Sequence, residues 1–319
     1  MPRRACQAGI PAMTVSRDRD DKARRNRRWI VVSLAPTIVL LVVLTIFPVL
    51  NMFGISFFDV KWSGGSPIFS FIGLDNYRRL FAGEVVYWAG VRNTIIFALS
   101  AVTSQMVLGF SMALAVRAAG SVGRTLLTGI FLMPIVIPPI VIGTMWRLIL
   151  GREFGLANIL LGLVGIPQVD WLGDPRIALA SVIFVDIWHW TPFVFLLMLA
   201  GLESLDQEIL EASRMDVTSF WQAVRHVIIP MMLPTILITL MLRLILSFKV
   251  FDEVYLLTSG GPGTSTEVVN FSIYRTFFAQ DQVGYGSAMS VVTLLSITLL
   301  IIVGRGVVQR RAAARSSRR

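Results

Sequence analysis

Long apolar runs dominate the hydrophobic pattern of this 319-residue chain. Six runs are long enough to cross a hydrocarbon core of about 30 Å, which takes about 20 helical residues. They lie at Trp29–Leu50, Asn93–Val116, Leu126–Leu150, Ile177–Leu202, Met231–Val250 and Tyr285–Gly304. Lipid offers no hydrogen bonds to the backbone, so such runs are expected as helices. The pattern therefore predicts an all-α polytopic membrane protein with six transmembrane helices.

Prolines interrupt the third of these runs. Pro134, Pro138 and Pro139 fall near its middle, where proline removes a helical hydrogen bond and clashes with the preceding turn. A broken helix at membrane depth is tolerated where protein or a cavity supplies the missing partners. We therefore expect the third span to line a pathway. Short helices are expected between the runs, within 151–175 and from Asp75, acting as an N-cap, to Leu80.

Charge is scarce and unevenly placed. The chain is 55% hydrophobic and 15% charged, with a net charge of +10. If the N-terminus is cytoplasmic, most basic residues fall in the N-terminal arm, the inner loops and the C-terminal tail. This fits the positive-inside rule and predicts an N-in/C-in topology. The positive charge is then explained by anionic lipid headgroups, and we expect no nucleic-acid partner.

Polarity divides the chain into three parts. Residues 1–28 are expected as a disordered basic cytoplasmic arm, 29–304 as the transmembrane domain, and 305–319 as a basic cytoplasmic tail. Cys6 is the single cysteine, so no internal disulfide can form. The first apolar run is too long for a cleaved signal peptide and has no small-residue cleavage site. Met13 is an alternative start to Met1.

The inner loop between the fourth and fifth runs, residues 204–230, has the most specific pattern. Ser204 and Gln207, and again Ser219 and Gln222, have the spacing of a capping box, which predicts two short helices. Apolar residues in the loop recur at roughly helical spacing. We expect a helix–turn–helix that lies across the inner face and docks into a groove of a cytoplasmic partner.

This loop resembles the EAA loop of ABC importer permeases, whose pattern is Glu-Ala-Ala, then Asp-Gly, then Pro about a dozen residues later. The matching positions are Glu211, Ala212, Ser213, Asp216, Val217 and Pro230. Two of them depart from the family: Ser213 replaces the second alanine, and Val217 replaces the glycine. A β-branched residue resists the positive φ that glycine adopts, so the turn either differs in conformation or is strained.

The resemblance extends over residues 30–305. The segments Phe71–Tyr77 and Leu257–Pro262 are similar to the maltose-type carbohydrate family. Transporters of this family contain two unlike permease subunits, and the segments resemble the first of them. The resemblance implies a type I ABC importer permease fold in a bacterial inner membrane. The implied partners are a second permease subunit, two copies of an ATP-binding subunit and an extracytoplasmic solute-binding protein. It implies no catalytic residue, metal or cofactor in this chain, with ATP and Mg held by the ATP-binding subunits.

The same resemblance places solute contacts on the third to fifth spans. The matching positions are Ile135, Pro139, His189, Trp190, Phe193, Arg243, Ser247 and Val250. The family member that binds maltose is more polar at several of them, so maltose itself is not expected. The solute classes left are an oligosaccharide, a polyol, or an acidic sugar or glycerol derivative. Trp188, Trp190 and Phe193 are candidates to stack on a sugar ring, with lipid or helix contact as the alternative.

Two ionisable residues within the spans need a reason to be there, since such groups face protein or a cavity. Arg243 is a clamp for an anionic group of the solute, a structural ion pair with Asp186 as its candidate partner, or an arginine that reaches to the outer interface. His189 is expected as a packed, hydrogen-bonded histidine. Lys249, Asp252 and Glu253 are expected as interfacial or gating charges.

Two other function classes fit the sequence less well. An ion-coupled secondary transporter needs carboxylates within the membrane, and Asp186 is nearly the only one in the predicted spans. Many such folds also contain internal repeats, and none is visible in this sequence. An intramembrane enzyme needs a catalytic motif, and the chain has two histidines, one cysteine and no His-Glu-x-x-His pattern. The requirement for ATP and a separate ATPase distinguishes these classes from an ABC importer.

Overall fold

The computed structural model describes residues 14–63, 65–206 and 219–316. The chain divides into two units, residues 1–54 and 55–319. The first contains helix α1, Thr14–Ile55, whose segment Trp29–Ile55 has a mean hydropathy of 2.8. The polar stretch before Trp29 is thus helical from Thr14, where we expected irregular chain. Its charge spacing favours this, because Asp18 and Lys22, like Asp20 and Arg24, stand four residues apart.

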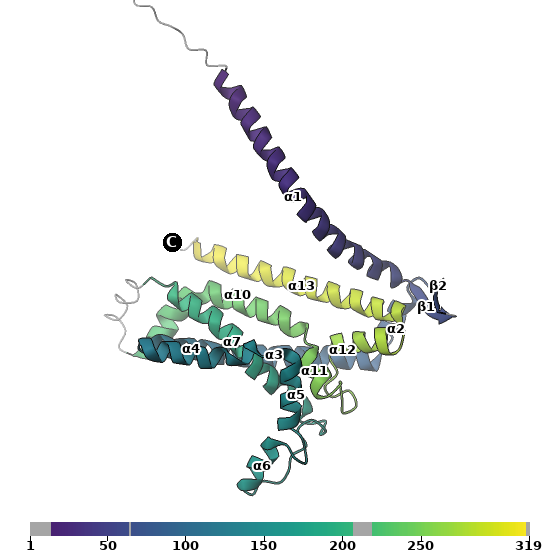
Figure 1. Cartoon of the computed structure of the whole chain (residues 1–319), viewed down its shortest axis with the longest axis vertical. Coiled ribbons are helices and arrows are strands. Elements are labelled where there is room, and N and C mark those ends of the chain that lie inside the picture. The colour runs from purple at the N-terminus through teal and green to yellow at the C-terminus, as the bar shows by residue number, and fades with distance from the viewer. Residues whose placement is uncertain (1–13, 64, 207–218, 317–319) are drawn as a thin grey trace, which may run out of the picture. The chain divides into compact units, whose positions relative to one another are not determined.

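Three long helices make the core of the second unit. They are α3 (Val85–Ala118), α7 (Ala178–Glu203) and α10 (Ile229–Phe248), and each contacts the other two (Figure 1). A fourth, α13 (Val283–Ser316), runs beside α10 and includes part of the predicted C-terminal tail. The backbones of α3 and α7 approach closely at Gly109, where a Cβ atom would lie 2.8 Å from the backbone nitrogen of Phe195.

The third apolar run is broken as its prolines predict. Helix α4 (Ser121–Val136) and helix α5 (Pro139–Ile149) meet at an angle of 93°. Pro139 begins α5 at the position where a missing N–H costs nothing. Over the described residues, five helices are long and apolar enough to cross a membrane, and the α4–α5 pair makes a sixth if it forms one span.

The segment between α1 and α3 contains strands, which the all-α expectation missed. Strands β1 (Phe58–Ser63) and β2 (Ser66–Phe71) pair antiparallel, with Phe58 opposite Phe71. Helix α2 (Asp75–Phe81) follows. Asp75 is its first residue and not its N-cap, a position held by Leu74 without a side-chain bond. The Asp75 carboxylate instead accepts a hydrogen bond of 3.1 Å from Arg78.

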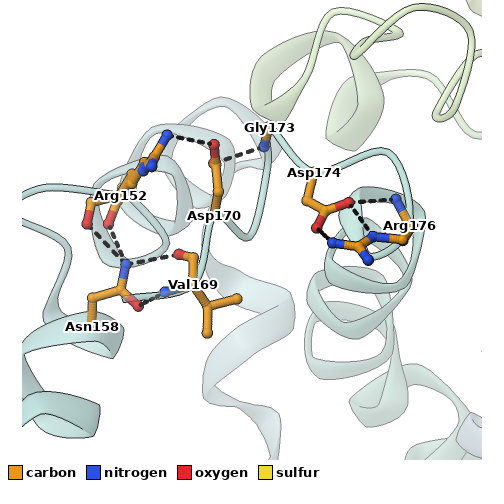
Figure 2. Close-up of polar contacts among 8 residues, drawn as sticks. Arg152, Asn158, Val169, Asp170, Gly173, Asp174 and Arg176 are labelled. Atoms are coloured by element: carbon orange, nitrogen blue, oxygen red, sulfur yellow. Dashed lines mark hydrogen bonds and ion pairs between the residues drawn. The ribbon is translucent and has the colours of Figure 1, made fainter. Parts of the chain in front are cut away.

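A polar scaffold holds the segment between α5 and α7, which includes helix α6 (Leu156–Leu163) as expected (Figure 2). The buried amide of Asn158 donates to the carbonyls of Arg152 and Val169, both at 2.9 Å. Its oxygen accepts from the Val169 N–H and the Trp171 indole, both at 3.1 Å. One buried side chain therefore fixes the path of this segment.

The second helix of the predicted helix–turn–helix is not a separate element. Helix α9 (Phe220–Ala223) passes through a π-helical turn, Val224–Ile228, directly into α10. Ser219 is the N-cap of α9 but makes no side-chain capping bond, so the predicted capping box is wrong there. Ser204 caps the C-terminal end of α7, its hydroxyl donating to the Gly201 carbonyl at 2.8 Å. The first predicted helix falls on 207–218, outside the described residues.

Candidate functional site

A hydrogen-bonded cluster of Gln105, Asp186 and Arg243, which we call the clasp, joins α3, α7 and α10. Arg243 donates from Nη2 to Asp186 Oδ2 and from Nε to Gln105 Oε1, both at 2.7 Å. Gln105 donates from Nε2 to the same carboxylate oxygen at 2.8 Å and to the Asp186 carbonyl at 3.0 Å. Each member therefore contacts the other two, and the three core helices are tied at one level.

The clasp is buried within this single chain. The side chain of Arg243 is 1% exposed and that of Asp186 is 3% exposed. A buried charge is tolerated when it is paired and hydrogen-bonded. Of the three interpretations left open by the sequence, the structure shows Arg243 in the ion pair with Asp186.

A second polar cluster lies beside the clasp, at the start of helix α11 (Asp252–Leu257). The buried Glu253 carboxylate lies 3.2 Å from His189 Nδ1 and accepts from the Trp190 indole at 3.4 Å. His189 is thus packed and hydrogen-bonded, as expected. Glu253 was expected at an interface or gate, and its burial against α7 could not be read from the sequence.

Trp190 connects the two clusters. The guanidinium carbon of Arg243 lies 4.9 Å from the centre of a Trp190 ring, in cation–π geometry. The indole N–H donates its hydrogen bond to the Glu253 carboxylate. The Phe193 and Trp190 rings meet edge to face, with centroids 6.2 Å apart. The Trp190 ring is therefore held on its face, at its nitrogen and at its edge. It remains partly exposed, so a further ligand can reach it.

The remaining residues predicted to contact solute separate into three settings. Ser247 is buried one turn beyond Arg243, and its hydroxyl has no hydrogen-bond partner in the described part of the chain. Val250 packs in the hydrophobic core with Val254 and Phe271. Ile135, partly exposed, and Pro139, exposed, lie on the two sides of the α4–α5 break. Side-chain contacts connect His189, Trp190, Phe193 and Arg243 into one cluster.

Trp188, the other aromatic candidate, has a different environment. Its ring meets Trp146 at a centroid distance of 5.5 Å and packs against the core that includes Val182 and Val185. This is the packed alternative that the sequence left open.

The coupling positions cannot be placed in the same way. Glu211, Ala212, Ser213, Asp216 and Val217 lie outside the described residues. Pro230 is the second residue of α10, which directly follows the π-helical turn Val224–Ile228. Phe220 and Trp221 in α9 are exposed, at 57% and 73%. The helix that carries Arg243 therefore begins within the predicted coupling segment, residues 204–230.

The ion pairs in the segment between α5 and α7 are local and lie at the surface. Asp174 accepts from Arg176 through both carboxylate oxygens, and Asp170 lies 3.5 Å from Arg152 (Figure 2). The Arg176 side-chain hydrogen bond, with its backbone N–H, lowers the pKa of Asp174 to about 2. In the described residues no group of three His, Cys, Asp or Glu side chains is placed to hold a metal ion.

Similarity to known proteins indicates the family of the chain, which the contacts of the site do not identify by themselves. Residues 105–313 match the family described as binding-protein-dependent transport system inner membrane component. The chain is 34% identical to the trehalose/maltose transport system permease protein MalF of Thermococcus litoralis, over 85% of this chain and 92% of that protein. It is 28% identical to the sulfoquinovosyl glycerol transport system permease protein SmoG of Agrobacterium fabrum, over 89% and 94%.

A solved structure shows the same fold at low sequence identity. It is a chain of a bacterial ABC transporter involved in the import of the acidic polysaccharide alginate. The TM-score is 0.80, with 21% identity over 92% of this chain and 99% of that one. The likeness covers nearly the whole length of both chains.

Proposed function

Because the chain belongs to the family of binding-protein-dependent transport system inner membrane components, we propose that it is a permease subunit of an ATP-driven importer of sugars. The observation that carries this is its 34% identity to a trehalose/maltose permease over 92% of that protein. The solute is an oligosaccharide, a polyol, or a related sugar or glycerol derivative, and the membrane is the bacterial inner membrane.

The proposed topology has six spans with both ends in the cytoplasm. The bent pair α4 and α5 serves as the third span, and its break at Ile137 and Pro138 faces the pathway. The basic arm before Trp29 and the basic tail after Gly304 anchor the cytoplasmic side. This arrangement puts α9 at the cytoplasmic end of α10.

Energy reaches the pathway through α10 in this proposal. Two copies of an ATP-binding subunit hold ATP and Mg, and they grip the segment around Glu211 here and the matching segment of a second, unlike permease. Because α9, the π-helical turn and α10 form one apolar span, Phe220–Phe248, movement of the coupling segment moves Arg243 as well. An extracytoplasmic binding protein delivers the solute to Trp190 and its neighbours. This chain hydrolyses no ATP.

An ion-coupled secondary transporter is the alternative. Its ion site would have to use Asp186 or Glu253, the carboxylates buried near α7. Asp186 is paired with Arg243 at 2.7 Å, and Glu253 is held by His189 and Trp190. Two carboxylates with protein partners support the ATP-driven assignment over an ion-coupled one.

The test is sugar uptake by the whole complex. This chain carries an affinity tag, and the complex captured through it is reconstituted in proteoliposomes with ATP enclosed. We expect uptake of radiolabelled trehalose or a related sugar that requires ATP and the binding protein and persists when proton and sodium gradients are collapsed. Uptake that follows an ion gradient and ignores ATP would show that the proposal is wrong.

A further inference from the structure

Arg243 is placed where a solute cannot reach it. Arg243 is among the largest fully buried side chains of the described residues, and this chain alone buries it. Its Nε and Nη2 atoms are directed at Gln105 and Asp186, and its face lies over Trp190. An anionic group of a solute could meet this guanidinium only after the clasp had opened.

The surroundings of Trp190 also disfavour an anion. The positive charge of Arg243 is offset by Asp186 at 2.7 Å. The other carboxylate near the ring is Glu253, which contacts both the Trp190 indole and His189. A carboxylate or phosphate beside Trp190 would approach Glu253 with the neighbouring guanidinium already paired, and like charges brought together disfavour binding.

An uncharged sugar ring, by contrast, suits the same geometry. A pyranose stacks its C–H face on an aromatic ring, and a ring already fixed in orientation loses little freedom when it binds. Arg243, Glu253 and Phe193 fix Trp190 on three sides. Trp190 keeps these contacts and is still partly exposed, and this exposed part is where a sugar ring would stack.

We infer that Arg243 is a positioning residue: through the clasp it holds Trp190 as a fixed platform for an uncharged sugar ring, and it does not bind the solute itself. This inference rests on the proposed function. It adds that the solute bears no negative charge at this level of the pathway. It also adds that, once Asp186 is neutralised as well, loss of Arg243 lowers solute transfer and spares ATP hydrolysis.

Variants of the reconstituted complex test the inference. Maltose is the neutral probe because of the 34% identity to a trehalose/maltose permease, although the sequence does not indicate maltose as the natural solute. Two rates are measured at saturating maltose-loaded binding protein: ATP hydrolysis and maltose uptake. Arg243→Gln leaves Asp186 buried without its cation, so we expect less complex and at least a tenfold loss of both rates. The pair Arg243→Gln with Asp186→Asn removes both charges and keeps hydrogen-bonding side chains. We expect it to restore complex yield and ATP hydrolysis, while maltose imported per ATP stays about fivefold low, the size of a lost cation–π contact.

Two controls accompany these variants. Arg243→Lys keeps the charge beside Asp186 but lacks the planar guanidinium that both donates to Gln105 and lies over the Trp190 ring. We therefore expect normal complex yield and partial recovery of maltose per ATP. Arg176→Gln removes an arginine that pairs with Asp174 at the same 2.7 Å on the surface, and we expect wild-type values throughout.

Three outcomes would overturn the inference. If the double variant recovers ATP hydrolysis and maltose per ATP together, the clasp is structural and does not position Trp190. If the complex is intact but neither rate recovers, the charge pair is needed for ATP hydrolysis itself and does not act by positioning Trp190. If maltobionate, the carboxylated analogue of maltose, is imported by the wild type and lost in both the single and double variants, Arg243 is an anion clamp. A wild-type complex that imports no sugar with ATP refutes the proposed function itself.

Discussion

Two aspartate–arginine pairs in this chain have the same length and opposite settings. Asp186 and Arg243 meet at 2.7 Å with side chains 3% and 1% exposed. Asp174 and Arg176 meet at 2.7 Å with side chains 24% and 87% exposed. The first pair joins α7 to α10, whereas the second spans two residues of one loop. Distance alone therefore does not measure what an ion pair contributes.

Burial decides the difference. An exposed pair gains little, because water and salt screen the charges and ordering the side chains costs entropy. A buried pair has already lost its hydration, so removing one partner leaves the other charge without compensation. Mutation of the pair between α7 and α10 should therefore lower the free energy of unfolding strongly, whereas mutation of the loop pair should hardly change it.

The largest expected effect comes from breaking the buried pair at its acid. Asp186→Ala leaves the Arg243 guanidinium buried beside Gln105, and we expect it to lower the free energy of unfolding by about 3–5 kcal/mol. An SDS titration in mixed micelles measures this. The matched variant Asp174→Ala should be indistinguishable from wild type in the same titration. Equal losses from the two variants would contradict the role given to burial.

The next effect tests the helix contact that aligns the clasp. In Gly109→Ala the new methyl group would lie 2.8 Å from the backbone nitrogen of Phe195 and from Val194 Cγ1, so α3 and α7 must separate. We expect a loss of about 1–3 kcal/mol in unfolding free energy. Gly129→Ala in α4 is the control, since nothing lies within 4 Å of its new Cβ. It should be neutral or stabilising, by up to about 1 kcal/mol.

A smaller and local effect is expected in the segment that carries the exposed pairs. Asn158→Ala removes the amide that bonds Arg152, Val169 and Trp171, leaving their polar groups unpaired. We expect about 1–3 kcal/mol of local destabilisation. Hydrogen exchange of residues 151–175 should accelerate about tenfold or more while that of α7 is unchanged. Unaltered exchange in this segment would mean that the surface ion pairs, and not the buried amide, hold it.

The smallest effect concerns pH. The pKa of Asp174 is about 2, below its unfolded value of about 3.9. The contribution of its bonds to Arg176 is thus fully present above about pH 4 and is lost as the pH falls toward 2. Hydrogen exchange around Arg176 should quicken over that range, beyond its intrinsic pH dependence. In Asp174→Asn that extra change should vanish, and its persistence would assign it to another group.

The sequence predicted the spans well and the clasp in part. Apolar runs and the prolines at 134, 138 and 139 are local signals, and they located the helices and the α4–α5 break. Arg243 and Asp186 were recognised as a candidate pair because charges within spans need partners. The sequence could not identify Gln105, because an amide in an apolar helix has no pattern that names its partner 81 residues away.

Other features depended on contacts that the sequence does not encode locally. Glu253 follows the end of an apolar run, so it was expected at an interface, and its burial arises from the packing of α11 against α7. Ser219 has capping-box spacing, yet α9 continues into α10 and its N-cap makes no side-chain bond. The hairpin of β1 and β2 is short, and its signals in the sequence are aromatic residues at 58, 69 and 71 and the Gly64-Gly65 pair between the strands.

The most direct test of the central claim is ATP hydrolysis by the complex purified through this chain and reconstituted in nanodiscs. The account predicts that a binding protein loaded with a neutral sugar stimulates hydrolysis severalfold, and that Glu211→Ala, in the predicted coupling segment, removes the stimulation while the complex stays intact. A complex that contains no ATPase, or whose ATPase ignores the loaded binding protein, would contradict the assignment of this chain as an importer permease.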